Sequence, residues 1–242
     1  MSEQVKAPKR RYNAPKRAAD AAATRRSVLE AARSLFVDRG YTATTVADIA
    51  AGAGVAVDTL YATVGRKPDL LRALVETSLS GTDVAVPARE RDYVKAIDAA
   101  ATAEDMIGIY ADALVAIQQR LAPIFVALRA AAVSEPSCAR LWSEISERRA
   151  RNMRDFAASL RRTGALREDL SDDQVADVLW SMNAAEYWHL LVAERHWTPE
   201  RFRDWLVDAW GRLLLAAPGQ RTAPLGAAPA PGADSGPQPA PR

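Results

Sequence analysis

Cysteine and histidine are nearly absent from the sequence, and their scarcity excludes several kinds of site. Cys138 is the single cysteine among 242 residues, and His189 and His196 are the two histidines. One thiol cannot form an intramolecular disulfide, and the three residues do not have the spacing of a metal site. A glycine-rich phosphate loop is missing as well. We therefore expect neither a bound metal nor a cofactor.

Long apolar runs and strand patterns are also missing. No apolar segment approaches the ~20 residues that a membrane-spanning helix needs, and the basic N-terminal region lacks the apolar core of a signal peptide. No segment alternates apolar and polar residues between turn signals, whereas apolar residues at helical spacing recur along the chain. The sequence predicts an all-α, cytoplasmic protein without a membrane partner.

The composition is that of a packed globular protein whose two ends differ from its body. Hydrophobic residues make up 49% of the chain and charged residues 26%. The net charge is only +2, yet basic residues are concentrated near the N-terminus. Residues 1–23 combine this charge with prolines, and residues 218–242 are rich in Pro and Ala. We expect a disordered basic arm and a disordered tail at these ends.

Three helices are expected in the first third of the chain. The first covers about 25–39 and ends at Gly40. Two short helices follow, one capped by Thr45 and one after Gly54. Two short helices that are joined by a glycine-containing turn and preceded by a longer helix are typical of a helix-turn-helix unit. We place this unit at residues 24–67.

Residues 68–217 are expected to form a larger helical domain. Pro68 suits the start of a helix, and Ser171 and Thr198 have the character of helix N-caps. The helices expected beyond residue 81 cover 90–100, 103–119, 121–133, 137–163, 172–194 and 199–216.

A set of residues between 25 and 75 occurs together in the register of a known domain. These residues are Leu35, Phe36, Gly40, Tyr41, Thr44, Thr45, Ile49, Ala50, Ala53, Gly54, Val55, Thr59, Leu60, Tyr61, Lys67, Leu70 and Leu71. With them, the segment resembles the DNA-binding domain of the tetracycline-repressor-like (TetR) family of transcription regulators. The resemblance implies a helical ligand-binding and dimerisation domain after it. It also implies a repressor that binds a palindromic DNA operator as a homodimer and is released by a small-molecule effector.

The third helix is predicted to carry the DNA-contacting surface. Leu60 is the only large apolar residue inside it that can anchor it, so its other faces are available to the major groove. Hydroxyl and ammonium groups suit phosphate oxygens, and apolar side chains suit thymine methyl groups. The candidate DNA-binding residues are Thr44, Thr45, Val57, Asp58, Thr59, Tyr61, Thr63 and Lys67.

Several of these assignments have a structural alternative. Asp58 either accepts from a cytosine amino group or only favours the helix start, and Tyr61 either faces DNA or packs partly in the core. Lys67 lies beside the positive N-terminal end of the fourth helix. Either a DNA phosphate binds there and compensates the positive charge of both, or Lys67 is a solvated loop residue. Ala56 stands where the family often has a capping serine, which predicts a loss of about 1 kcal/mol. The basic arm either follows the DNA or is a solvated tail.

Apolar stripes on the last two predicted helices are the candidates for a dimer interface. A palindromic site calls for a two-fold dimer, and the family pairs through its two C-terminal helices. Either stripe could instead be the core of one chain. The candidate interface residues are Val175, Leu179, Met182, Phe202, Leu206, Trp210 and Leu213.

The larger domain also has the ingredients of a small-molecule cavity, because all six tryptophans lie in it. Arg149 and Asn183 interrupt apolar stripes, and a buried charge needs a partner. Arg149 either pairs with Glu186 or holds an anionic effector. The candidate ligand-binding residues are Trp142, Arg149, Trp180, Asn183, Glu186 and Tyr187.

The sequence favours a DNA-binding regulator over an enzyme, because it contains no HExxH or GxSxG motif. Two other functions stay open: a helical protein-interaction module without DNA binding and, least favoured, a helical enzyme. Failure to bind the DNA that flanks its own gene would favour the first. Turnover without affinity for DNA would favour the second.

Overall fold

The computed structural model describes residues 14–217 and residue 219, and this part of the chain forms helices and no strand. The first four helices are α1 (Ala14–Arg39), α2 (Val46–Gly52), α3 (Val57–Thr63) and α4 (Lys67–Ser80). They are followed by α5 (Asp92–Ala99), α6 (Ala103–Ala132), α7 (Pro136–Arg162), α8 (Asp172–Met182), α9 (Ala185–Trp188) and α10 (Pro199–Leu214). A 3-10 turn covers Ala88–Glu90, and a π-helical turn covers His189–Glu194. The predicted all-α class is confirmed.

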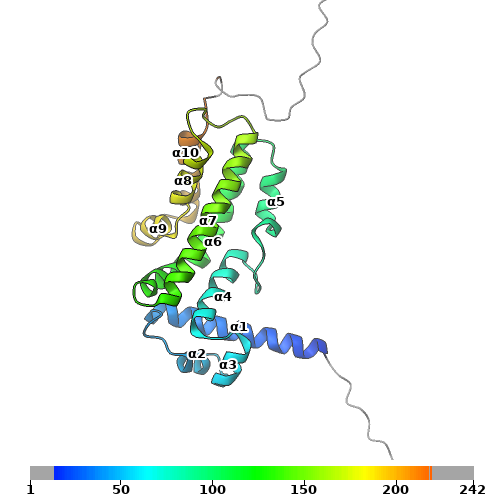
Figure 1. The fold of residues 1–242 in the computed structure, drawn as a ribbon, viewed down its shortest axis with the longest axis vertical. Helices are drawn as coiled ribbons and strands as arrows, with labels where there is room; N and C mark the ends of the chain where they lie inside the picture. The colour runs from blue at the N-terminus through cyan, green and yellow to red at the C-terminus, as the bar shows by residue number, and fades with distance from the viewer. Residues whose placement is uncertain (1–13, 218, 220–242) are drawn as a thin grey trace, which may run out of the picture.

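Two long helices, α6 and α7, form the centre of the larger domain (Figure 1). Helices α4, α5 and α10 pack against α6, and α8 packs against α7. Helix α1 lies across one end of these helices, with α2 and α3 beyond it (Figure 1). The helix-turn-helix unit therefore forms one tip of the molecule, and α4 joins it to the body.

Local sequence signals define the two short helices. The Thr45 hydroxyl accepts from the Asp48 N–H at 3.1 Å, and the Asp48 carboxylate accepts from the Thr45 N–H at 3.0 Å, which completes the predicted capping box. Gly54 then turns the chain with a φ of +67°, a conformation that favours glycine. Helix α3 follows Ala56, which makes no side-chain capping hydrogen bond, as expected. Leu60 is the one buried residue of α3.

Helix α1 begins at Ala14 and not near residue 25, so it includes part of the stretch that was predicted to be a disordered basic arm. Residues 14–23 are therefore helical, which corrects the prediction of disorder for them. Alanine, lysine and arginine dominate this stretch, and all three are strong helix formers. The rest of the arm, 1–13, and the predicted tail lie outside the described residues, except for residue 219.

Helix α6 replaces two predicted helices, 103–119 and 121–133, and it runs without interruption through Pro123. The residues around the proline, Leu121, Ala122, Ile124 and Phe125, are buried, so packing on several sides compensates for the lost backbone hydrogen bond. By length and composition α6 could cross a membrane, which the sequence did not lead us to expect. However, 56% of its most apolar window is buried inside the protein, as in a core helix.

The predicted helix 172–194 is broken after Met182, and the cause is a contact from another helix. Gln118 Nε2 on α6 donates to the Asn183 carbonyl oxygen at 2.7 Å. Ala184 then becomes extended, with φ −66° and ψ 144°, and the chain resumes as α9. As a result, the side chains after Met182 do not have the orientations that a continuous helix would give them.

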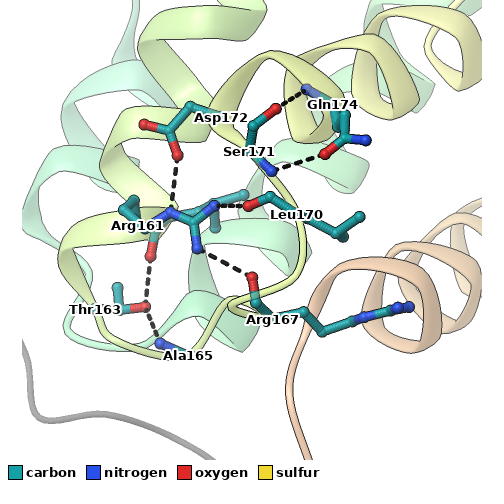
Figure 2. A network of polar contacts seen from close by, with 9 residues as sticks. Arg161, Thr163, Ala165, Arg167, Leu170, Ser171, Asp172 and Gln174 are labelled. Carbon is teal, nitrogen blue, oxygen red and sulfur yellow. Dashed lines mark hydrogen bonds and ion pairs between the residues drawn. The ribbon is translucent and has the colours of Figure 1, made fainter.

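The loop between α7 and α8 is held by Arg161 from the end of α7 (Figure 2). Its guanidinium donates to the carbonyl oxygens of Arg167 and Leu170 and pairs with Asp172 at 2.8 Å. The predicted capping box at Ser171 is present at the start of α8. This network fixes α8 against α7.

Candidate nucleic-acid interface and internal cavity

Helix α3 presents almost all of its side chains to the outside. Leu60 is fully buried and anchors the helix, whereas Val57, Asp58 and Thr59 are exposed. Tyr61 is 47% exposed, so its ring lies mainly outside the core. Val57 and Tyr61 are thus both exposed on this short helix. The outward face that the sequence predicted is therefore present.

The flanking threonines have different positions. Thr44 is buried, and its hydroxyl reaches the carbonyl oxygens of Gly40 at 2.8 Å and Leu35 at 3.1 Å. These bonds tie the turn to the end of α1, so the prediction that the Thr44 side chain contacts DNA is corrected. Thr45 is exposed at the start of α2, while the Thr63 hydroxyl donates to the Thr59 carbonyl oxygen at 2.6 Å.

Lys67 is neither a solvated loop residue nor a free cation. It is the first residue of α4, one position earlier than expected, and its Nζ lies 4.1 Å from the centroid of the Tyr41 ring. Burial lowers the pKa of Lys67, and the nearby Glu135 and Cys138 oppose that shift. Cys138 is itself buried against Tyr41 at the start of α7. The ammonium group thus sits in the seam between the helix-turn-helix unit and α7.

Arg66 is a candidate that the sequence reasoning missed. It is exposed, it precedes α4 directly, and no ion pair to it is found within the described residues. The turn before it requires Gly65, whose φ is +105° and whose hypothetical Cβ would lie 2.7 Å from Asp69 Oδ2. Adjacent basic residues after the third predicted helix were a signal for this position, but the sequence could not tell which one faces outward.

A cavity of about 750 Å³ lies between α5, α6 and α7. This volume is in the range that holds small organic ligands. Much of its wall is apolar and includes Leu114, Ile117, Leu121, Phe125, Ile145 and Phe156. A few polar side chains line the same space, among them Gln118, Arg148, Arg149 and Asn183.

Gln118 and Asn183 form a buried polar cluster in the cavity wall, at 2% and 3% exposure. Gln118 Nε2 is used by the Asn183 carbonyl oxygen, as described above. Asn183 Nδ2 donates to the Tyr110 hydroxyl at 2.8 Å and approaches Met153 Sδ at 3.0 Å. Gln118 Oε1 and Asn183 Oδ1 have no hydrogen-bond partner in the described part of the chain. Two buried acceptors are thus left open beside the cavity.

Arg149 is one of the charged residues that line the cavity. Its guanidinium lies 4.5 Å from the Trp180 ring centroid and donates to the Trp180 carbonyl oxygen at 3.1 Å. Burial lowers the pKa of Arg149, and Tyr110 and Glu186 act in the opposite direction. Glu186 forms its ion pair with Arg129, so the expected Arg149–Glu186 pair is not formed. Arg149 Nε has no partner among the described residues.

Only part of the predicted ligand-binding set lines the cavity. Arg149 and Asn183 line the cavity, whereas Trp142, Trp180, Glu186 and Tyr187 do not. The break after Met182 redirects the last two, and Tyr187 stacks on Trp205 at 5.6 Å instead. The residues that the sequence reasoning missed are Tyr110, Gln118 and Arg148. Gln118 could have been found as a polar residue in an apolar stripe.

The predicted dimer residues mostly belong to the core of one chain. Val175, Leu179, Met182, Phe202, Leu206 and Trp210 are buried within it. These stripes face inward because α8 packs against α7, and α10 packs against α6 and α8. Leu213 is the exception, with 45% of its surface exposed. The open alternative, intramolecular core, therefore holds for six of the seven.

Comparison with known proteins agrees with this architecture. Residues 28–74 match the family model described as bacterial regulatory proteins, tetR family. No match was found among curated protein sequences.

Solved structures share the fold at low sequence identity. A protein from Saccharomonospora viridis in complex with choline has 19% identity and a TM-score of 0.60, covering 80% of this chain and 98% of its own. The SmeT–triclosan complex has 17% identity and a TM-score of 0.63, covering 91% and 100%. NalD, the secondary repressor of the MexAB-OprM multidrug efflux pump in Pseudomonas aeruginosa, has 17% identity and a TM-score of 0.58, covering 79% and 97%. Residues 28–74 thus match the tetR family of bacterial regulatory proteins, and the chain shares its fold with these solved structures.

Proposed function

We propose that the protein is a cytoplasmic, non-enzymatic DNA-binding regulator that represses transcription from a palindromic operator. The observation that carries this proposal is the surface of α3, where every side chain except Leu60 is at least partly outside the core. A short helix at the tip of the molecule, held by one apolar residue, suits insertion into the major groove.

The contacts divide into those that position the helix and those that read bases. Thr45 and Tyr61 supply hydroxyls, and the exposed Arg66 supplies a cation, all suited to phosphate oxygens. Val57 and Thr59 are exposed where α3 would meet base edges. Thr63 belongs to the same candidate face, and Asp58 serves either a cytosine amino group or the helix start. Lys67 would join the phosphate contacts only after leaving the Tyr41 ring.

A palindromic operator requires two copies of α3, and we propose a homodimer through the outer faces of α8 and α10. Leu213 is exposed there, and Val178, Trp205 and Ala209 are partly exposed. Apolar side chains on the solvent side of helices whose other side is already packed are candidates for burial against a second chain.

Release by a small-molecule effector is supported by the connections between the cavity and α4. Arg148 lines the cavity and pairs with Glu76 of α4 at 2.8 Å. Arg120 of α6 donates from Nε to the Ser78 carbonyl oxygen at 3.1 Å, and Arg33 of α1 donates to the Arg120 carbonyl oxygen at 2.6 Å. A ligand that shifts α6 or α7 would therefore shift α1 and α4, and with them α3. Such a ligand lowers DNA affinity by its preference for the shifted state.

Binding to the DNA that flanks the gene tests the proposal. We expect footprinting to reveal a two-fold symmetric protected site, with weaker binding at higher salt. Arg66→Ala should reduce the slope of log affinity against log salt by about 1. Tyr61→Phe should weaken binding about tenfold without changing that slope.

Arg154→Ala is the matched control for the loss of a cation, because Arg154 is an exposed residue of α7 that pairs with Asp173. It should leave both affinity and slope unchanged. Absence of protection at every salt concentration would contradict the proposal and favour a protein-interaction module.

A further inference from the structure

The polar atoms around the cavity define the chemistry of the molecule that fits it. Gln118 cannot turn its amide around, because its Nε2 is needed by the Asn183 carbonyl oxygen. Its Oε1 is therefore fixed as an acceptor, and it has no donor in the described chain. The Asn183 amide likewise leaves one of its polar atoms open after bonding to Tyr110. A ligand that displaces water from this cluster must supply a hydrogen-bond donor, or it loses affinity.

Charged residues of both signs line the cavity, and its five arginines outnumber its three carboxylates. Tyr110 lies close enough to Arg149 for each to influence the other's pKa. Glu186 pairs with Arg129 and forms no ion pair with Arg149, and the Trp180 carbonyl oxygen is the one acceptor of Arg149 among the described residues. A half-buried guanidinium without a carboxylate partner favours an anion in the adjoining space.

A cationic ligand is disfavoured by the same excess of arginines. Recognition of a quaternary ammonium group uses open aromatic faces. Aromatic rings do line the cavity, among them Tyr93, Phe125 and Phe156, but an ammonium group there would share the space with the arginines of the wall. The choline bound by the Saccharomonospora protein therefore represents the wrong charge for this cavity.

We infer that the effector is an amphipathic organic monoanion that carries a hydrogen-bond donor next to its acid group, such as a 2-hydroxy acid with an apolar chain. The acid group pairs with Arg149, the adjacent donor reaches Gln118 Oε1 or Asn183 Oδ1, and the chain lies along the apolar wall of α6 and α7. This inference rests on the proposed regulatory function for its biological meaning, but the binding chemistry stands on the cavity alone.

Isothermal titration calorimetry of the full chain without DNA tests the inference with four probes. They share a ten-carbon chain: 2-hydroxydecanoate, decanoate, 1,2-decanediol and decyltrimethylammonium. We expect 2-hydroxydecanoate to bind tightest, decanoate about fivefold more weakly and the neutral diol at least about tenfold more weakly. The ammonium probe should not bind. A diol that binds as tightly as the hydroxy acid, or no binding of the acids up to about 1 mM, overturns the inference.

Variants connect the preference to one side chain. Arg149→Met should abolish the preference for 2-hydroxydecanoate over the diol, whereas Arg154→Met, the same change at an exposed site of α7, should preserve it. Arg149→Lys keeps the positive charge and should retain the preference. It is the variant to measure if Arg149→Met does not fold. A preference that survives Arg149→Met in a folded protein contradicts the assignment. The calorimetry contains no DNA, so its outcome does not depend on operator binding. The footprinting outcome likewise does not depend on the ligand preference of the cavity.

Discussion

The helix-turn-helix unit and the larger domain differ in how completely their buried polar groups are hydrogen-bonded. Thr44, buried in the first, has two carbonyl acceptors for its hydroxyl. Gln118, Asn183 and Trp210, buried in the second, each keep a polar atom without a partner in the described chain. A unit that binds its target on its surface can have all its buried polar groups hydrogen-bonded. A domain that binds its target in an internal cavity leaves polar groups without a partner, to which the ligand can bond.

The largest effect should come from the single anchor of α3. Leu60→Ala removes the one buried side chain of that helix and should lower the free energy of unfolding by about 2–5 kcal/mol in urea titrations. DNA affinity should fall with it, because α3 loses its fixed position. Val57→Ala, at an exposed site of the same helix, should change stability by less than about 0.5 kcal/mol. Equal losses for the two variants would contradict this account of α3.

A change from glycine to alanine should have opposite signs in the two regions. Gly65→Ala places a Cβ 2.7 Å from Asp69 Oδ2 at a φ of +105°, and should destabilise the protein by about 1–3 kcal/mol. Gly108→Ala lies inside α6, where the nearest atom is an ordinary 3.6 Å away, and should stabilise by about 0.5–1 kcal/mol. Thermal unfolding of both variants measures the difference. The comparison fails if Gly65→Ala proves neutral.

Removing a buried polar group should cost more stability in the helix-turn-helix unit than at the cavity of the larger domain. Thr44→Val deletes a hydroxyl and leaves two carbonyl groups without it, so we expect a loss of about 1–2 kcal/mol. Asn183→Leu deletes an amide that already has an unpartnered atom, and the loss should stay below about 1 kcal/mol. Urea titrations of the two variants side by side decide the point. A larger loss for Asn183→Leu would show that the polar cluster is structural.

The smallest expected effect concerns the missing cap of α3. Ala56→Ser supplies the side-chain acceptor that the N-cap lacks and should stabilise the protein by about 0.5–1 kcal/mol. Ala62→Ser, on the exposed side of the same helix, offers no cap and should be neutral or slightly destabilising. Differential scanning calorimetry resolves such shifts. Identical shifts for the two serines would show that capping does not limit α3.

The helix-turn-helix unit was predictable because its signals are local. Thr45 and Asp48 cap α2 within four residues, and Gly54 ends the turn, so the sequence alone located both short helices. The orientation of Lys67 was not predictable, because it depends on Tyr41 and on Glu135, far away in the chain. Contacts over long sequence separations leave no periodic signal.

The larger domain shows the same limit on a larger scale. Its helical content followed from apolar spacing, but the break after Met182 depends on Gln118, 65 residues before the carbonyl it bonds. That break decides which predicted ligand residues reach the cavity. The apolar stripe of α10 was correctly located, but periodicity indicates a buried face without saying which helix covers it.

The buried position of Cys138 allows local opening of the protein to be measured. As the single thiol, buried where α7 meets Tyr41, it should react with a thiol reagent only after a local opening exposes it. The labelling rate of the native protein therefore reports how often this contact opens. Comparing this rate with and without a bound molecule shows whether binding changes the frequency of opening. The measurement requires neither operator DNA nor a crystal.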